Sequence, residues 1–272
     1  GLPLPAANAC AIRSVSDAAI HFCLTIKNLF GLALRQTTGF VQSLLVLSGL
    51  EWPVPDFSTL CRRQRRLDVQ VAYRSSASGL HLLVDSTGIK FLGEGEWKCK
   101  KHGQERRRQW RKLHIGIDAQ TLQIRAICVT LNNITDAAAL PHWLEQVPAK
   151  EPLLTVTGDG AYDMQPVHAA VMQRNAMPII PPRKNARMRK GDAFVHRNAA
   201  IAACRRFGRK LWKSWSGYHR RSLVETKMNC IKRLGERVMS RTFERQVNEL
   251  HIRAAILNRF TELGCPQTVA VA

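Results

Sequence analysis

The sequence predicts an α/β fold in which a mixed sheet is flanked by helices and preceded by a small helical region. Two continuous apolar runs, Leu80 to Val84 and Leu153 to Gly158, are typical of strands that are buried on both faces of a sheet. Each run leads directly into an aspartate, Asp85 or Asp159. Three early strands followed by helices that alternate with strands favour a mixed sheet.

Residues 1–77 are predicted to form a helical, DNA-binding region. Ser16 or Asp17 can cap a helix that runs toward Phe30, and a second apolar helical pattern follows from residue 36 to residue 50. Ser58 can cap a short third helix, which carries Arg62, Arg63, Arg65 and Arg66. Two interpretations of these arginines stay open, contact with a phosphate backbone or a solvated helix face.

The sheet is predicted to lie within residues 78–265, and residues 266–272 form a tail. The pattern predicts strands at residues 80–85, 112–118, 123–131, 153–159 and 177–180. It also predicts helices at residues 136–147 and 166–174. We place the boundary between the helical region and the sheet near residues 75–78, where the pattern changes from helical to alternating.

A further helix is predicted from Tyr218 to Lys232, because this stretch contains no glycine or proline. Offsets of 3, 7 and 14 residues from Tyr218 reach Arg221, Glu225 and Lys232, so helix geometry puts all four on one stripe. Val224 and two later apolar residues form a neighbouring stripe that can pack on the sheet. A single acid beside Arg and Lys is usually a surface ion pair, but two acids that follow strands strengthen a functional interpretation.

Composition favours a polyanionic partner. The 272 residues contain 41 Lys and Arg against 20 Asp and Glu, a formal net charge of +21, which attracts nucleic acid. The most apolar stretch, residues 40–50, is too short to span a bilayer and nothing resembles a signal peptide, so we expect a cytoplasmic protein without a membrane partner. The eight cysteines form no Cys-x-x-Cys pair, which argues for reduced packing residues and against a structural zinc site.

Three acids carry the predicted chemistry. Phosphodiester cleavage requires that negative charge on phosphorus is neutralised while an oxygen nucleophile is aligned, and two Mg²⁺ ions can do both. Mg²⁺ prefers hard oxygen ligands, so a few carboxylates suffice. We therefore expect Asp85, Asp159 and Glu225 to be both the catalytic residues and the ligands of Mg²⁺ (or Mn²⁺), with Asp85 bridging two ions and Asp159 and Glu225 each holding one of them.

These residues resemble the signature of bacterial insertion-sequence transposases of the DDE type. The third block of that family has the pattern Y-x2-R-x3-E-x6-K, and Tyr218, Arg221, Glu225 and Lys232 fill every position. The blocks around Asp85 (LVDSTG) and Asp159 (GDGAYD) are also similar, as is the stretch 93–106. The chain begins at Gly1, and members of the family carry additional residues before such a helical region, so we expect part of the DNA-binding apparatus to be absent.

The resemblance implies an RNase H-like catalytic domain that cleaves DNA strands and transfers them to a target. It implies that the partners are the terminal inverted repeats of the element and the target DNA, and that the chain acts as a homo-oligomer on paired ends. Tyr218, Arg221 and Lys232 are expected to contact DNA near the cut end. Two alternatives stay open: an RNase H-like nuclease without strand transfer, and a DNA-binding derivative that has lost catalysis.

Further candidate DNA contacts come from two basic segments. Trp97, with Lys98, Lys100 and Lys101, lies on a predicted hairpin where the tryptophan can stack on a base or serve as a core residue. The stretch from Arg183 to Lys213 contains eleven Lys and Arg residues and one acid, Asp192, a density that favours contact with a phosphate backbone. Trp212 and Trp215 interleave with the end of this stretch.

Other titratable residues compete for the catalytic role. Asp118 and Asp163 follow or adjoin strands, yet a turn or capping role is favoured for them, and Asp136 is expected to cap a helix. His114 and His219 are expected to be structural or to contact DNA, since a metal-bound water does not need an imidazole base.

Overall fold

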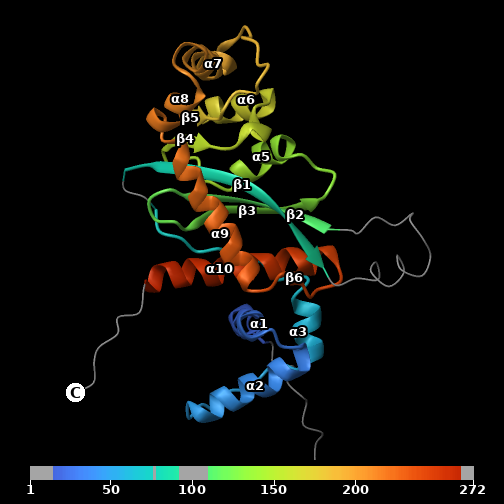
Figure 1. Cartoon of the computed structure of the whole chain (residues 1–272). Coiled ribbons are helices and arrows are strands. Elements are labelled where there is room, and N and C mark those ends of the chain that lie inside the picture. Colours follow the sequence, from blue (N-terminus) through green and yellow to red (C-terminus); the bar gives the residue numbers. More distant parts are fainter. Residues whose placement is uncertain (1–14, 76–77, 92–109, 265–272) are drawn as a thin grey trace, which may run out of the picture. The chain divides into compact units, whose positions relative to one another are not determined.

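In the computed structural model, the described residues are 15–75, 78–91 and 110–264 (Figure 1). The chain divides into two compact units, Gly1–Leu67 and Asp68–Ala272. The division falls several residues before the boundary that the change of sequence pattern predicted. The second unit therefore includes the extended segment that leads into the first strand.

From residue 15 onward, the first unit contains three helices, α1 (Asp17–Phe30), α2 (Leu34–Leu47) and α3 (Phe57–Arg63). Ser16 is the N-cap of α1, as one of the two predicted caps, and accepts a hydrogen bond from the Ala19 amide. The cap of α3 is Asp56 and not Ser58, because the Asp56 carboxylate accepts from the Ser58 amide at 3.2 Å.

The predicted arginine-rich helix is only partly correct. α3 contains Arg62 and Arg63 and ends at Arg63, so Arg65 and Arg66 follow the helix. Arg63 forms an ion pair with Asp17 and donates to the Val15 carbonyl, which makes it a tie between the first and third helices. Arg63 is thus engaged within its own unit.

No single helix in the described ranges is long and apolar enough to cross a membrane. By length and composition α1 and α2 pass such a test only as a pair, and they meet at a bend of 107°.

The second unit is built on a six-stranded mixed sheet with the order β3-β2-β1-β4-β5, in which β6 also pairs with β1. The first three strands, β1 (Leu80–Phe91), β2 (Trp110–Asp118) and β3 (Ile124–Leu131), are antiparallel. β4 (Leu153–Thr157) and β5 (Met177–Ile179) extend the sheet in parallel with β1, as does β6 (Arg237–Val238). The predicted mixed sheet flanked by helices is confirmed.

Each face of the sheet is covered by its own helices. Leu82 and Val84 of β1 pack with α5 (Asp136–Leu144) and α6 (Gln165–Gln173) in one apolar cluster. Leu83 and Ile89 point the other way and pack with α9 (Ser222–Arg233) and α10 (Phe243–Leu263). This alternation follows from the two-residue period of a strand and explains why the first half of β1 is continuously apolar.

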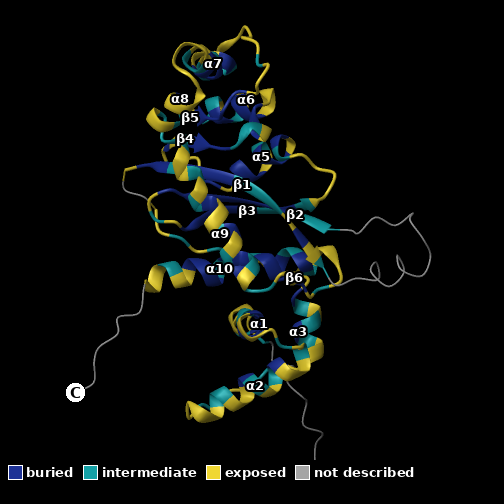
Figure 2. Cartoon of the chain, in the orientation of Figure 1, coloured by how far each residue is buried: buried dark blue, intermediate teal, exposed yellow. Residues whose placement is uncertain are grey.

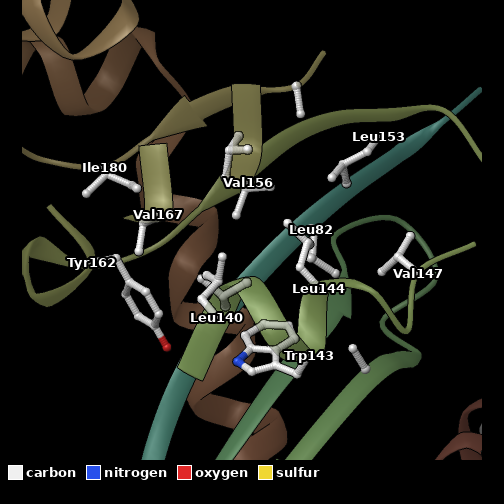
Figure 3. Packing of buried hydrophobic residues seen from close by; sticks show 14 of the residues in the cluster. Leu82, Leu140, Trp143, Leu144, Val147, Leu153, Val156, Tyr162, Val167 and Ile180 are labelled. Atoms are coloured by element: carbon white, nitrogen blue, oxygen red, sulfur yellow. The ribbon is translucent and has the colours of Figure 1, made fainter. Parts of the chain in front are cut away.

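The first of these clusters is a dense hydrophobic core (Figure 3). Trp143 of α5 is 1% exposed and contributes the largest side chain. The tight fit leaves no room beside it at Gly116 of β2, where an added Cβ would lie 2.9 Å from the Trp143 ring. Figure 3 also shows the Tyr162 hydroxyl pointing away from Val167 and Ile180.

Beyond β5, a segment of short helices continues the chain. It contains the 3-10 turn η2 (Asp192–Phe194), α7 (Val195–Phe207) and α8 (Arg209–Trp215). Residues of α7 and α8 pack against Ile179 of β5 in a small third cluster. Figure 2 shows that much of the surface of these helices is exposed.

Candidate active site

Asp85 and Asp159 lie at the same level of neighbouring parallel strands. The register pairs Leu83 of β1 with Thr157, the last residue of β4. Continuing this register by two residues sets Asp85 opposite Asp159. Asp159 is the N-cap of the 3-10 turn η1 (Gly160–Tyr162), and its carboxylate accepts the Ala161 amide at 2.9 Å.

The sequence predicted that Asp85 ends its strand, and this prediction is wrong. β1 runs on to Phe91 because it keeps pairing with β2 on the other side, where Asp85 lies opposite Ile115. On the β4 side the pairing stops at Leu83, and β1 finds its next partner only at Lys90. Asp85 therefore lies where β1 and β4 separate, which leaves one side of the strand open around its carboxylate.

Glu225 approaches from α9, on the sheet face to which Asp85 belongs. Asp85 shares the parity of Leu83, and Leu83 packs in the cluster that contains Val224 and Met228 of α9. Burial of this apolar stripe fixes the helix on the sheet and leaves the neighbouring polar stripe at its edge. The Glu225 side chain is 53% exposed there.

The predicted continuous helix from Tyr218 to Lys232 begins as a different structure. Gly217 adopts a left-handed conformation with φ 71°, a 3-10 turn η3 (Tyr218–Arg221) follows, and the α-helix starts at Ser222. Residues three apart eclipse one another in a 3-10 turn, so Tyr218 and Arg221 still share one side. Arg221 and Glu225 then form an i,i+4 ion pair.

Arg221 links the strand to the helix. Its guanidinium donates to the Asp85 carboxylate at 3.1 Å and to Glu225, and its side chain is 18% exposed. The sequence predicted a DNA contact for Arg221 but could not indicate this bridge, because Asp85 is 136 residues away. The same group thus holds two of the three predicted catalytic acids around one positive charge.

Electrostatic interactions connect the three acids. Burial raises the pKa of Asp85, and the charges of Asp159 and Glu225 act in the same direction, while the Ser86 amide and Arg221 oppose them. Burial also raises the pKa of Tyr218, which feels both Asp159 and Asp85 and is hydrogen-bonded to Arg221. A cluster of carboxylates with one bridging cation favours the binding of further positive charge.

Two sequence profiles described as the transposase DDE domain match the chain, one over residues 5–94 and the other over residues 76–259. The second match covers more than half of the chain and contains all three acids. The chain belongs to the DDE transposase family. Its mixed sheet with flanking helices is the RNase H-like fold of that family, as the sequence predicted.

The donor set of this transposase suits Mg²⁺, since three carboxylates offer the hard oxygens that this ion prefers. In the present arrangement, however, no three His, Cys, Asp or Glu side chains in the described ranges are grouped closely enough to hold a metal. Arg221 is paired with both Asp85 and Glu225 in this arrangement, and the Glu225 side chain is 53% exposed.

The competing acids of the transposase have structural partners. Asp118 is fully buried and closes a turn, where it accepts from the Gln120 amide and the Thr121 hydroxyl. Asp136 is not the cap of α5, since Thr135 takes that role; instead Asp136 pairs with Lys112 at 2.9 Å. The turn predicted at Asp118 is therefore present, whereas the cap predicted at Asp136 is wrong.

Asp163 anchors the segment beyond β5. Its carboxylate accepts two bonds from Arg197 of α7 at 2.6 and 3.2 Å, one from the Arg183 amide and one from His168. Burial opposes ionisation, but these donors outweigh it and hold the pKa of Asp163 well below its usual range. Sequence reasoning missed this anchor, because Arg197 lies 34 residues away and carries no local signal.

The two histidines considered in the sequence differ in burial. His114 is fully buried beside Thr130 and Asp136, at 2.9 and 3.4 Å, which gives it a structural environment. His219 is exposed on η3.

The remaining predicted DNA contacts divide between described and undescribed parts of the transposase. Tyr218 is half-buried. The centroid of its ring lies 6.2 Å from that of Trp212, and the Lys213 ammonium lies 4.9 Å from the centroid of the Tyr218 ring. Lys232 lies in the last turn of α9, two turns beyond Glu225. Trp97, Lys98, Lys100 and Lys101 lie outside the described residues.

Proposed function

We propose that this chain is an active insertion-sequence transposase, which uses one site for metal-dependent cleavage of DNA strands and for strand transfer. The observation that carries the proposal is that Asp85 and Asp159 each follow, by two residues, the last paired residues of β1 and β4, with Glu225 joined to Asp85 through Arg221. Three acids far apart in sequence thereby share one electrostatic environment.

In this proposal Asp85, Asp159 and Glu225 hold Mg²⁺ or Mn²⁺, with Asp85 as the shared ligand of two ions. Such a pair activates the attacking hydroxyl and stabilises the leaving oxygen when it is bound. Asp85 is suited to the shared position because its side chain is only 17% exposed and its strand is held by β2 on one side. Asp159 is fixed by its cap contact, whereas Glu225 retains freedom to move.

The cations on η3 and α9 serve the DNA in the proposal. Arg221, when it is released from the acids, would be able to form paired contacts with phosphate oxygens, and Lys232 would supply a second charge along the neighbouring helix. Tyr218 adds a hydroxyl beside Arg221. Because an insertion sequence has two ends, we further propose that the chain works as a homo-oligomer on DNA.

The test is cleavage and joining by the full chain. Supercoiled DNA that carries the element ends is incubated with Mg²⁺ or Mn²⁺, and nicked and joined products are separated on a gel. We expect nicking that requires the metal, followed by joined products. Nicking without joining identifies a nuclease, and binding without nicking identifies a non-catalytic derivative.

Replacing Arg221 by Met is expected to tighten Mn²⁺ binding in the absence of DNA by roughly tenfold. The guanidinium competes with the metal for Asp85 and Glu225, so its removal frees both carboxylates. Isothermal titration calorimetry measures the change. Arg220→Met is the matched control, because Arg220 loses the same charge but donates to the Ala119 carbonyl; equal or weaker binding in Arg221→Met contradicts the competition.

A further inference from the structure

A basic groove lies beside the proposed site, between the segment 182–187 and the helices α7 and α8. It has a volume of about 640 Å³ and ten lining residues, of which half are Arg or Lys and none is acidic. The five cations are Arg183, Lys184, Arg187, Arg205 and Arg209. In the part of the chain that the structure describes, none of these five forms an ion pair with a carboxylate. The groove thus concentrates uncompensated positive charge.

Residues 182–187 form one lip of this groove, and hydrogen bonds hold this segment in place. Arg205 donates to the Ala186 carbonyl at 3.2 Å, and Arg209 donates to the Pro182 carbonyl at 2.5 Å. Arg197 fastens the Arg187 carbonyl at 2.8 Å. These acceptors are neutral, so the guanidinium charges stay uncancelled, and each guanidinium keeps donors beyond the one it uses. The site is therefore organised before any ligand arrives.

The segment that lines the groove follows β5, which is the neighbour of β4 in the sheet. β5 pairs with β4 through Thr157 and Ile179, and the Gly158 amide donates to the Ile179 carbonyl at 3.3 Å. The chain then passes directly from β5 into the lip at Pro182. The start of the groove thus follows the strand that neighbours β4, which leads into Asp159.

A packed link joins the groove to the third-block residues. Trp212 of α8 is buried with Ile179 of β5, and Tyr218 packs on the same cluster. Tyr218 in turn is hydrogen-bonded to Arg221. The two tryptophans that interleave with the basic stretch differ in exposure. Trp212 is a core residue, whereas Trp215 is 63% exposed and open to a ligand.

We infer that this groove binds the sugar-phosphate backbone of the DNA that is being cleaved, away from the scissile bond. The inference rests on the proposed function for the identity of its polyanion. An open groove whose charged lining residues are all cationic suits a chain of phosphates. Its place next to the Asp159 edge lets one duplex contact the groove and the acids together.

The experiment compares two charge reversals that change the net charge equally. Lys184 is exposed in the lip, whereas Lys150 is exposed just before β4, at the end of the strand opposite to Asp159. Fluorescence anisotropy with a labelled duplex gives the affinity of Lys184→Glu and Lys150→Glu over a series of salt concentrations. Unchanged melting temperatures verify that both variants are folded.

We expect Lys184→Glu to weaken binding by at least about tenfold, and the slope of log K against log salt concentration to become shallower by about 0.9 for each phosphate that is no longer neutralised. Lys150→Glu should leave both nearly unchanged. Equal affinities and equal slopes in the two variants overturn the inference. Arg187→Gln is a second variant without charge reversal and should weaken binding in the same direction. Inorganic phosphate at the same ionic strength should not displace the duplex; displacement by phosphate would identify a single-phosphate site and overturn the inference.

Failure of this inference and failure of the proposed function have different signatures. If the chain nicks DNA with Mg²⁺ but Lys184→Glu binds as Lys150→Glu does, only the groove assignment is wrong. If no nicking occurs yet Lys184→Glu still binds more weakly, the groove stands and the catalytic proposal falls.

Discussion

Asp85→Asn is expected to lower metal-dependent DNA cleavage by at least about 10³-fold while DNA binding persists. The amide keeps the shape of the side chain but removes the charge that two metal ions would share. It also leaves Arg221 with Glu225 alone. Initial rates of nicking of supercoiled DNA measure the loss, and anisotropy measures the binding.

Glu145→Gln is the control for this experiment. It removes one negative charge from an exposed position at the end of α5, away from the three acids in sequence. We expect it to cleave as the parent chain does. Substantial cleavage by Asp85→Asn contradicts the assignment of Asp85.

Asp163→Ala is expected to lower the free energy of unfolding by about 3–5 kcal/mol. The substitution leaves the buried guanidinium of Arg197 and the buried His168 ring without their carboxylate partner. It also frees the amide of Arg183, at the lip of the basic groove. Urea unfolding followed by circular dichroism measures the change.

Asp159→Asn, only four residues away, is expected to behave in the opposite way. Asparagine can keep the cap contact with Ala161, so stability should change by less than about 1 kcal/mol while cleavage is lost. If Asp163→Ala is as stable as the parent chain, or if Asp159→Asn retains cleavage, the division of roles between these two acids is wrong.

The Asp163 anchor also predicts a pH dependence of stability. Its folded pKa lies below the ordinary carboxyl value of about 3.9, so its contribution is fully present above that value and is lost as the pH falls. Unfolding of the parent chain and of Asp163→Asn should therefore differ strongly at pH 6 and converge as the pH is lowered below about 4. A constant difference over that range contradicts the ionised anchor.

The sequence predicted the elements whose signals are local. The apolar runs before Asp85 and Asp159 located β1 and β4, and the apolar stripe of Val224, Met228 and Ile231 located α9. The i,i+4 pair of Arg221 and Glu225 also follows from spacing alone. In each case neighbouring residues in sequence determine the contact.

The features that were missed depend on distant partners. β1 continues past Asp85 because β2 keeps pairing with it, and no local break marks the end of the pairing with β4. The 3-10 start of the third block follows Gly217 in a left-handed conformation, which helical periodicity does not reveal. The Asp163 anchor and the Arg221 bridge join residues 34 and 136 positions apart.

The central claim is that Asp85, Asp159 and Glu225 bind divalent cations jointly. The most direct measurement is anomalous diffraction from crystals of the full chain grown with DNA and Mn²⁺. We predict anomalous peaks whose ligands, taken together, include oxygens of Asp85, Asp159 and Glu225, with Asp85 shared where two ions are present and Arg221 displaced onto a phosphate. A set of peaks to which any one of these three residues contributes no ligand, or an intact Arg221 bridge in the metal-bound complex, contradicts the account.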